Sequence, residues 1–81
     1  MDNNKIMKIA QVKQGKKWIE SYTDTNAKNV FESFIGDLVA KKFDHADFVK
    51  SIRRTQVLYN GFYKYVVTYS NGVRAVYIIN Y

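Results

Sequence analysis

Three runs of alternating residues fill the last third of the chain, and an Asn-Gly pair lies between each run and the next. The runs cover residues 55–59, 62–69 and 73–81 and are rich in Val, Ile, Tyr, Phe and Thr. Asn-Gly between such runs favours a two-residue type I′ turn, because both central residues of that turn need positive φ. The pattern therefore predicts a three-stranded antiparallel meander with tight turns at 60–61 and 71–72.

These turns predict which side chains of the meander share a face. A two-residue turn at 71–72 pairs Val67 with Val76, and one at 60–61 pairs Leu58 with Tyr63. One face would then carry Tyr63, Tyr65, Tyr69, Val67, Leu58, Val76 and Ile78, with Arg54, Gln56, Arg74 and Asn80. The other would carry Val57, Tyr59, Phe62, Val66, Val73, Ala75, Tyr77, Ile79 and Tyr81, with Arg53, Thr55, Lys64, Thr68 and Ser70. We expect the second, more aliphatic face to lie against helices, and the reverse assignment stays open.

The first half of the chain predicts a hairpin followed by a helix. Alternation around the turn signal at 14–16 indicates a hairpin over roughly residues 5–23. Asp, Thr and Asn at 24–26 are typical of a helix start. A stripe with helical spacing then predicts a helix over about 26–42 that lies against the sheet. The stripe consists of Val30, Phe31, Phe34, Ile35, Leu38 and Val39.

A second, shorter helix is predicted directly after the first. Asp44 suits the N-cap and Asp47 the first turn, where the helix dipole favours an acidic residue. Phe48, Val49 and Ile52 would form its apolar side, and it would end near Arg53. The expected order is β-β-α-α-β-β-β, an α+β single domain over residues 1–81 with two helices on one face of an antiparallel sheet. Whether the first hairpin joins that sheet stays open.

Charge distinguishes this chain from an average small domain. Thirteen Lys and Arg against seven Asp and Glu give a net charge of +6 over 81 residues. Such an excess favours acidic partners, with nucleic acid first among them, although positive charge also serves solubility alone. Many Lys, Asn, Tyr and Ile residues, whose codons are rich in A and T, suggest an AT-rich source such as a low-GC bacterium or its phages.

Candidate catalytic chemistry is sparse. His45 is the one histidine, and the aspartates beside it are explained by helix capping. Without cysteine, one histidine and scattered carboxylates do not match the usual metal-ligand spacings. We therefore expect no enzyme activity, no metal and no cofactor. No apolar run approaches the length of a membrane span, and the first residues do not resemble a signal peptide, so we expect a cytoplasmic protein without membrane contact.

Basic residues and tyrosines provide the candidate contact surface. One basic group lies in the turn of the first hairpin and another at the end of the predicted second helix, and such groups can hold backbone phosphates. A tyrosine row with an arginine beside it resembles, in chemistry only, a sheet platform that stacks bases. The same row would instead be a second core layer if the first hairpin covered it. The candidate contact residues are Lys13, Lys16, Lys17, Lys50, Arg53, Arg54, Tyr63, Tyr65, Tyr69 and Arg74.

Two classes of function follow from this surface. The leading expectation is a small non-enzymatic protein that binds nucleic acid through Lys, Arg and Tyr side chains. The alternative is a protein-binding inhibitor or adaptor, of the kind that phages and mobile elements use to block a host enzyme or a defence complex such as a CRISPR nuclease. Tyr and Arg are also enriched at protein interface hot spots. Composition alone therefore leaves both classes, the partner's identity and the oligomeric state open.

Overall fold

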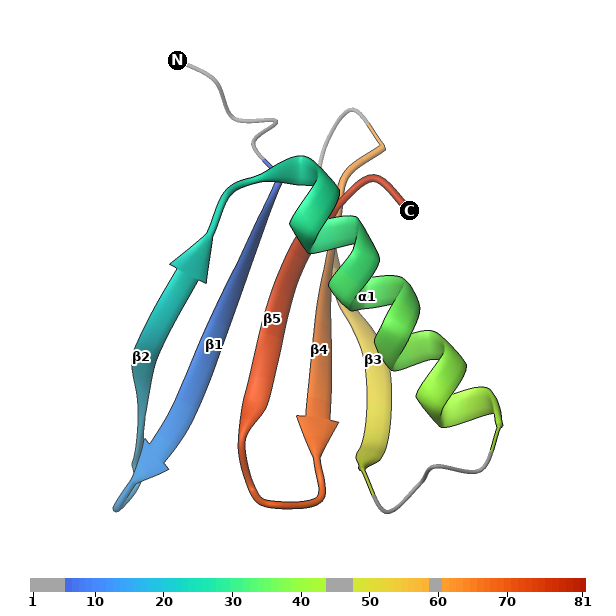
Figure 1. Ribbon diagram of the computed structural model, residues 1–81. Helices are drawn as coiled ribbons and strands as arrows, with labels where there is room; N and C mark the ends of the chain where they lie inside the picture. The colour runs from blue at the N-terminus through green and yellow to red at the C-terminus, as the bar shows by residue number, and fades with distance from the viewer. Residues whose placement is uncertain (1–5, 44–47, 59–60) are drawn as a thin grey trace.

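One antiparallel sheet and one helix make up the described part of the chain. The computed structural model describes residues 6–43, 48–58 and 61–81. The elements are β1 (Met7–Gln14), β2 (Lys17–Asp24), α1 (Ala27–Lys42), β3 (Val49–Val57), β4 (Tyr63–Tyr69) and β5 (Arg74–Ile79). The strand order is β2-β1-β5-β4-β3, and every neighbouring pair is antiparallel. Figure 1 shows α1 crossing one face of this sheet over β5, β4 and β3. The predicted α+β class is confirmed in this coarser form.

The first hairpin joins the main sheet. Its inner strand, β1, pairs along β5, with Met7 opposite Ile78 and Gln11 opposite Arg74. The hairpin therefore adds two strands at the edge of the sheet, which has five strands in all, and does not fold across the sheet. α1 leaves β1 and β2 largely uncovered (Figure 1).

The predicted second helix is wrong from Val49 onward, because this segment is strand β3. The register shifts between Val49 and Ser51, where a β-bulge adds one residue to β3. The bulge places Val49 opposite Tyr69 and Ile52 opposite Val67, so both point to the same face of the sheet. A spacing of three between apolar residues normally indicates a helix, but here it results from the bulge in the strand. The aspartates and histidine at 44–47 lie outside the described residues.

The predicted two-residue turn at 71–72 is also wrong. Residues 70–73 connect β4 to β5. The Tyr69 N–H donates to the Val73 carbonyl at 2.9 Å, so three residues, 70–72, form the loop inside this last pair. The Gly72 N–H donates back to the Tyr69 carbonyl at 3.1 Å, and Gly72 has φ of 86°. This is the geometry of a type I turn followed by a glycine bulge. The Asn71 side chain stabilises it by accepting the Val73 N–H at 3.0 Å.

The longer loop changes the pairing of the meander by one residue. Val67 lies opposite Ala75, whereas the two-residue turn would have paired Val67 with Val76. At the other turn Val57 lies opposite Tyr63, and residues 59–60 lie outside the described part of the chain. A shift of one residue moves every side chain of a strand to the other face. The two predicted faces therefore exchange the side chains of β5.

The helix is confirmed, but it is rotated relative to the predicted stripe. Asn26 caps it, accepting the Asn29 N–H at 3.1 Å. Val30 and Phe34 are fully buried, whereas Ile35 and Val39 are 43% and 47% exposed. The buried line continues to Asp37, which is only 6% exposed although its charge assigns it to the polar side.

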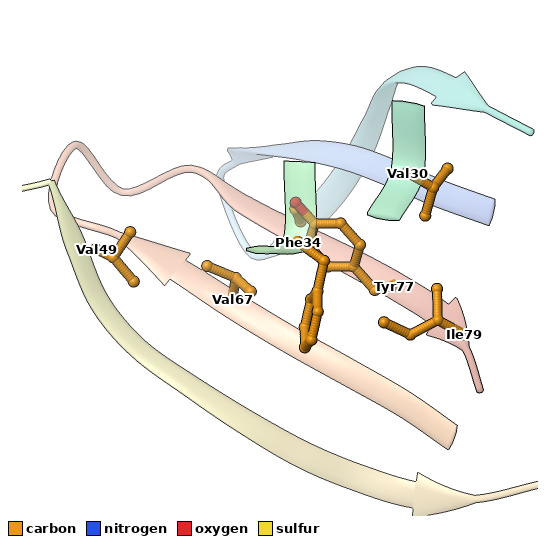
Figure 2. Close-up of a cluster of buried hydrophobic side chains, with 7 residues drawn as sticks. Val30, Phe34, Val49, Val67, Tyr77 and Ile79 are labelled. Carbon is orange, nitrogen blue, oxygen red and sulfur yellow. The ribbon is translucent and has the colours of Figure 1, made fainter. Parts of the chain in front are cut away.

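The core lies between α1 and the sheet face that α1 covers. Figure 2 shows Val30 and Phe34 reaching from α1 toward Val67, Tyr77 and Ile79 of the sheet. The Phe34 ring centre lies 4.9 Å from that of Tyr65 and 5.0 Å from that of Tyr77. The fully buried set is Val30, Phe34, Val49, Val67, Ala75, Tyr77 and Ile79. α1, the one helix of the described ranges, is too short and too polar to cross a membrane.

Candidate functional site

The strand register defines which side chains lie on the sheet face opposite α1, which is called here the open face. Cross-strand pairs align its side chains in three rows. The first row consists of Gln11, Arg74, Thr68 and Ser51. The second consists of Ile9, Val76, Val66 and Arg53. The third consists of Met7, Ile78, Lys64 and Gln56. The open face therefore has an aliphatic centre with basic and polar side chains around it.

The β1–β2 hairpin extends the open face. Trp18 lies opposite Lys13, and Glu20 lies opposite Gln11. The register shifts between Ala10 and Gln11, where β2 has one extra residue. Because of this bulge, Trp18 and Glu20 belong to the open face while Tyr22 lies on the side of α1.

A stacked cation lies where the hairpin meets the rest of the sheet. The guanidinium carbon of Arg74 lies 3.9 Å from the centre of the Trp18 ring. The Arg74 Nε donates to Gln11 Oε1 at 2.6 Å, and Lys13 Nζ lies 5.8 Å from the same indole ring. Partial burial lowers the pKa of Arg74 from its ordinary value. These contacts join β5, β1 and β2 across the open face.

Cations outnumber carboxylates on the open face and at the hairpin tip. These regions contain six cations, Lys13, Lys16, Lys17, Arg53, Lys64 and Arg74, against one carboxylate, Glu20. The side of α1 contains five cations, Lys8, Lys28, Lys41, Lys42 and Arg54, against Asp24, Glu32 and Asp37. Lys50 lies at the bulge of β3 and is assigned to neither side. Lys17 pairs with Gln14, so the strand register assigns it to the side of α1. Counted by face over the described residues, four cations minus one carboxylate on the open face and six minus three on the side of α1 both give +3, so the two faces differ in their number of carboxylates and not in net charge.

The tyrosine row does not belong to the open face. Tyr65 packs against Phe34, and the Tyr69 hydroxyl donates to Asp37 Oδ2 at 2.7 Å, so both lie on the side of α1. Tyr63 is on the same side, beneath the Arg54 guanidinium, whose carbon is 4.6 Å from its ring centre. The expectation that Arg74 shares a face with these tyrosines is wrong, because the shifted register moves β5 by one residue. Tyr65 and Tyr69 pack against the core beneath α1. The predicted core layer under the first hairpin is wrong, because that hairpin extends the sheet.

The basic group predicted at the end of a second helix is divided between faces. Lys50, Arg53 and Arg54 lie in β3, where successive side chains alternate. Arg53 is opposite Val66 on the open face, and Arg54 is opposite Tyr65 on the side of α1. The second predicted basic group stays together, since Lys13, Lys16 and Lys17 all lie at or beside the turn between β1 and β2.

A polar cluster on the side of α1 is absent from the sequence-based prediction. Asp37 Oδ2 accepts the hydroxyl protons of Tyr69 at 2.7 Å and of Tyr77 at 2.6 Å. The Tyr77 hydroxyl also lies 2.9 Å from the Ser33 hydroxyl, to which Lys8 Nζ donates at 2.7 Å. The signal in the sequence is the spacing of Asp37, which falls seven residues after Val30 and three after Phe34, on the buried side of the helix.

Raising the pH above the ordinary tyrosine value of 10.0 is expected to destabilise the fold through Tyr69 and Tyr77. Burial first, and the hydrogen bond to Asp37 second, raise the pKa of both hydroxyls. Unfolded tyrosines ionise near 10.0 while these two keep their protons, so the unfolded state loses protons first and the free energy of unfolding decreases as pH rises further. Below that pH this contribution is complete and constant. Thermal melts over an alkaline series, with tyrosinate absorbance, measure the effect.

The double variant Tyr69→Phe, Tyr77→Phe is the control for that titration. It removes the two hydroxyls whose pKa values are raised and keeps both aromatic rings. Its melting temperature should decrease less steeply with alkaline pH than that of the wild type. Equal slopes would contradict the assignment of the effect to Tyr69 and Tyr77.

The described residues contain no pocket and no group of three or more His, Asp or Glu side chains that could hold a metal ion. The open face is the candidate site because it brings four cations and partly exposed aliphatic side chains together. No protein-family model, no curated protein and no solved structure matches this chain.

Proposed function

We propose that this chain is a small non-enzymatic binding protein that contacts the backbone of nucleic acid through its open face. The observation that carries the proposal is that the described part of the open face brings four cations together with a single carboxylate. Lys13, Arg53, Lys64 and Arg74 come from four strands of one face, where Glu20 is the one carboxylate among the described residues. Phosphate contacts by Lys and Arg provide most of the affinity of proteins that bind without sequence preference.

The proposed contact surface differs from the one expected from the sequence. Tyr65 and Tyr69 contact core residues and Asp37, so they do not contribute a stacking platform. The aliphatic side chains at the centre of the open face cannot stack with bases as aromatic rings do. Trp18 is the one aromatic ring that the strand pairing assigns to the open face within the described residues. The proposal therefore rests on backbone contacts by cations.

Removing open-face cations should weaken nucleic-acid binding more than removing the same charge elsewhere. The test variant is Lys13→Gln, Arg53→Gln, Lys64→Gln. The matched control is Lys28→Gln, Lys41→Gln, Lys42→Gln, whose cations lie on α1. Each triple variant has the same net charge, so a difference between them reports position. Labelled single- and double-stranded oligonucleotides titrated at several salt concentrations give the affinity and its salt slope.

The expected result is a smaller slope of log affinity against log salt in the open-face variant and an unchanged slope in the control variant. Each lost phosphate contact should lower the slope of log affinity against log salt by about 0.7–0.9. Affinity should decrease equally for all sequences, since backbone contacts do not distinguish bases. Equal effects of the two triple variants would contradict the open face as the contact surface. Absence of binding by the wild type at ~50 mM salt and micromolar protein would contradict nucleic acid as the partner.

A second candidate function has its own supporting observation, the aliphatic centre of the open face. Ile9, Val66 and Ile78 are partly exposed there, and Trp18 and Arg74 lie beside them. An apolar centre with a polar rim and Trp or Arg anchors is typical of protein–protein interfaces. In this case the chain would be an inhibitor or adaptor of phage or mobile-element type that binds a host protein or a nucleoprotein complex. Capture from host lysate with and without nuclease distinguishes the two, because a stoichiometric protein partner would survive nuclease.

A further inference from the structure

The side chain of Arg74 is held in one orientation by two neighbouring strands. It starts on β5, passes over Gln11 of β1 and ends against Trp18 of β2. The guanidinium carbon lies 3.9 Å from the centre of the indole ring, and this contact restricts the position of the guanidinium. The bond from Nε to Gln11 Oε1 at 2.6 Å restricts its rotation. An arginine fixed in this way loses little further freedom when it binds a ligand.

The fixed orientation determines which donors Arg74 can offer. A guanidinium has five N–H donors in a rigid fork, and Nε uses one of them on Gln11. The two terminal nitrogens, Nη1 and Nη2, form the edge that matches two oxygens of a phosphate group. Lys13 Nζ lies 5.8 Å from the centre of the same indole ring and adds a second positive charge close to that ring.

We propose that Arg74, oriented by Trp18 and Gln11 and assisted by Lys13, is a preorganised binding site for one phosphodiester group. The proposal deepens the proposed function and rests on it for the identity of the ligand. It makes Arg74 different in kind from the other cations of the open face. Arg53 lies at the opposite edge of that face, is exposed, and contributes as a charge alone. The phosphate recognised at Arg74 requires the planar fork as well as the charge.

The comparison of Arg74→Lys with Arg53→Lys tests this difference. Each substitution keeps the net charge of the protein and the face on which the cation lies, and each replaces a planar guanidinium with a lysine ammonium group. Trp18 is the one tryptophan of the chain, so its fluorescence reports directly on a ligand at Arg74. The probes are an oligothymidylate, followed by both fluorescence and anisotropy, and inorganic polyphosphate, followed by fluorescence. Thermal melts of each variant identify any loss of folded protein, and Gln11→Ala serves as a second variant that leaves both arginines in place.

The expected result is a saturable fluorescence change whose affinity decreases about tenfold or more in Arg74→Lys and less than about twofold in Arg53→Lys. Gln11→Ala should weaken binding in the same direction as Arg74→Lys. Binding by anisotropy with equal effects of the two lysine variants would overturn the site while the proposed function stands. A fluorescence response to polyphosphate alone would overturn a phosphodiester group as the ligand at Arg74 and contradict nucleic acid as the partner. No response to either probe would overturn both.

Discussion

Phe34→Ala is expected to lower the free energy of unfolding by about 3–5 kcal/mol. Phe34 is fully buried, and its ring is surrounded by the rings of Tyr65, Tyr77 and Tyr81 at centre distances of 4.9, 5.0 and 5.2 Å. Removing it leaves a cavity between α1 and the sheet that neighbouring side chains cannot fill. Such a loss is a large part of the roughly 5–15 kcal/mol that stabilises a typical domain. Urea denaturation of both proteins measures the difference.

Ile35→Ala is the matched control for Phe34→Ala. It truncates the neighbouring residue of the same helix, but Ile35 is 43% exposed. Ile35→Ala should lower the free energy of unfolding by less than about 1.5 kcal/mol, because it removes less buried apolar surface than Phe34→Ala does. If Phe34→Ala melted within a degree or two of the wild type, or if Ile35→Ala cost as much, the orientation of α1 described here would be wrong.

Asp37→Ala is expected to cost roughly 2–6 kcal/mol. The substitution removes the oxygen that accepts both the Tyr69 and the Tyr77 hydroxyls, at 2.7 and 2.6 Å. The Tyr69 hydroxyl would lose the acceptor to which it donates, whereas the Tyr77 hydroxyl keeps the Ser33 hydroxyl as a partner at 2.9 Å. The cost therefore comes from two lost hydrogen bonds to a charged group and from one unsatisfied hydroxyl. Asp37→Asn keeps an acceptor oxygen and should cost less. Chemical denaturation gives the values for all three proteins.

Adding Tyr69→Phe and Tyr77→Phe to Asp37→Ala separates the hydrogen bonds from the packing. The triple variant contains neither the acceptor nor the two donors, so it should recover part of the stability that Asp37→Ala loses. The non-additivity measures the coupling between the carboxylate and the two hydroxyls. Additive effects would show that Asp37 is tolerated in the core for a reason other than these two hydrogen bonds.

The candidate site was predictable from the sequence in its chemistry and not in its arrangement. Lys13, Lys16, Lys17, Arg53 and Arg74 were expected as contacts, and the open face and its hairpin tip carry all of them. The partnership of Arg74 with Trp18 joins residues far apart in the chain, so no local pattern indicates it. Lys64 and Gln11 join the surface through the same long-range pairing of β1, β5 and β4.

Local patterns were sufficient where one segment's own residues decide its structure. The capping side chain of Asn26 and the helical spacing after it determine α1, and turn residues around Gly15 determine the first hairpin. The β-branched and aromatic runs of β4 and β5 likewise specify strands without reference to distant residues. The positive net charge follows from composition alone.

Only the tertiary structure decided which side chains share a face. Alternation determines a face within one strand, but the relation between strands depends on loop length and on bulges, and one residue reverses it. The three-residue loop at 70–72 placed the tyrosines of β4 on the same face as Tyr77 and separated them from Arg74. The bulge after Val49 explains why this segment is a strand although the spacing of its apolar residues is typical of a helix. These choices are made by burial against α1, because Val67, Ala75 and Tyr77 exclude water together only in the observed register.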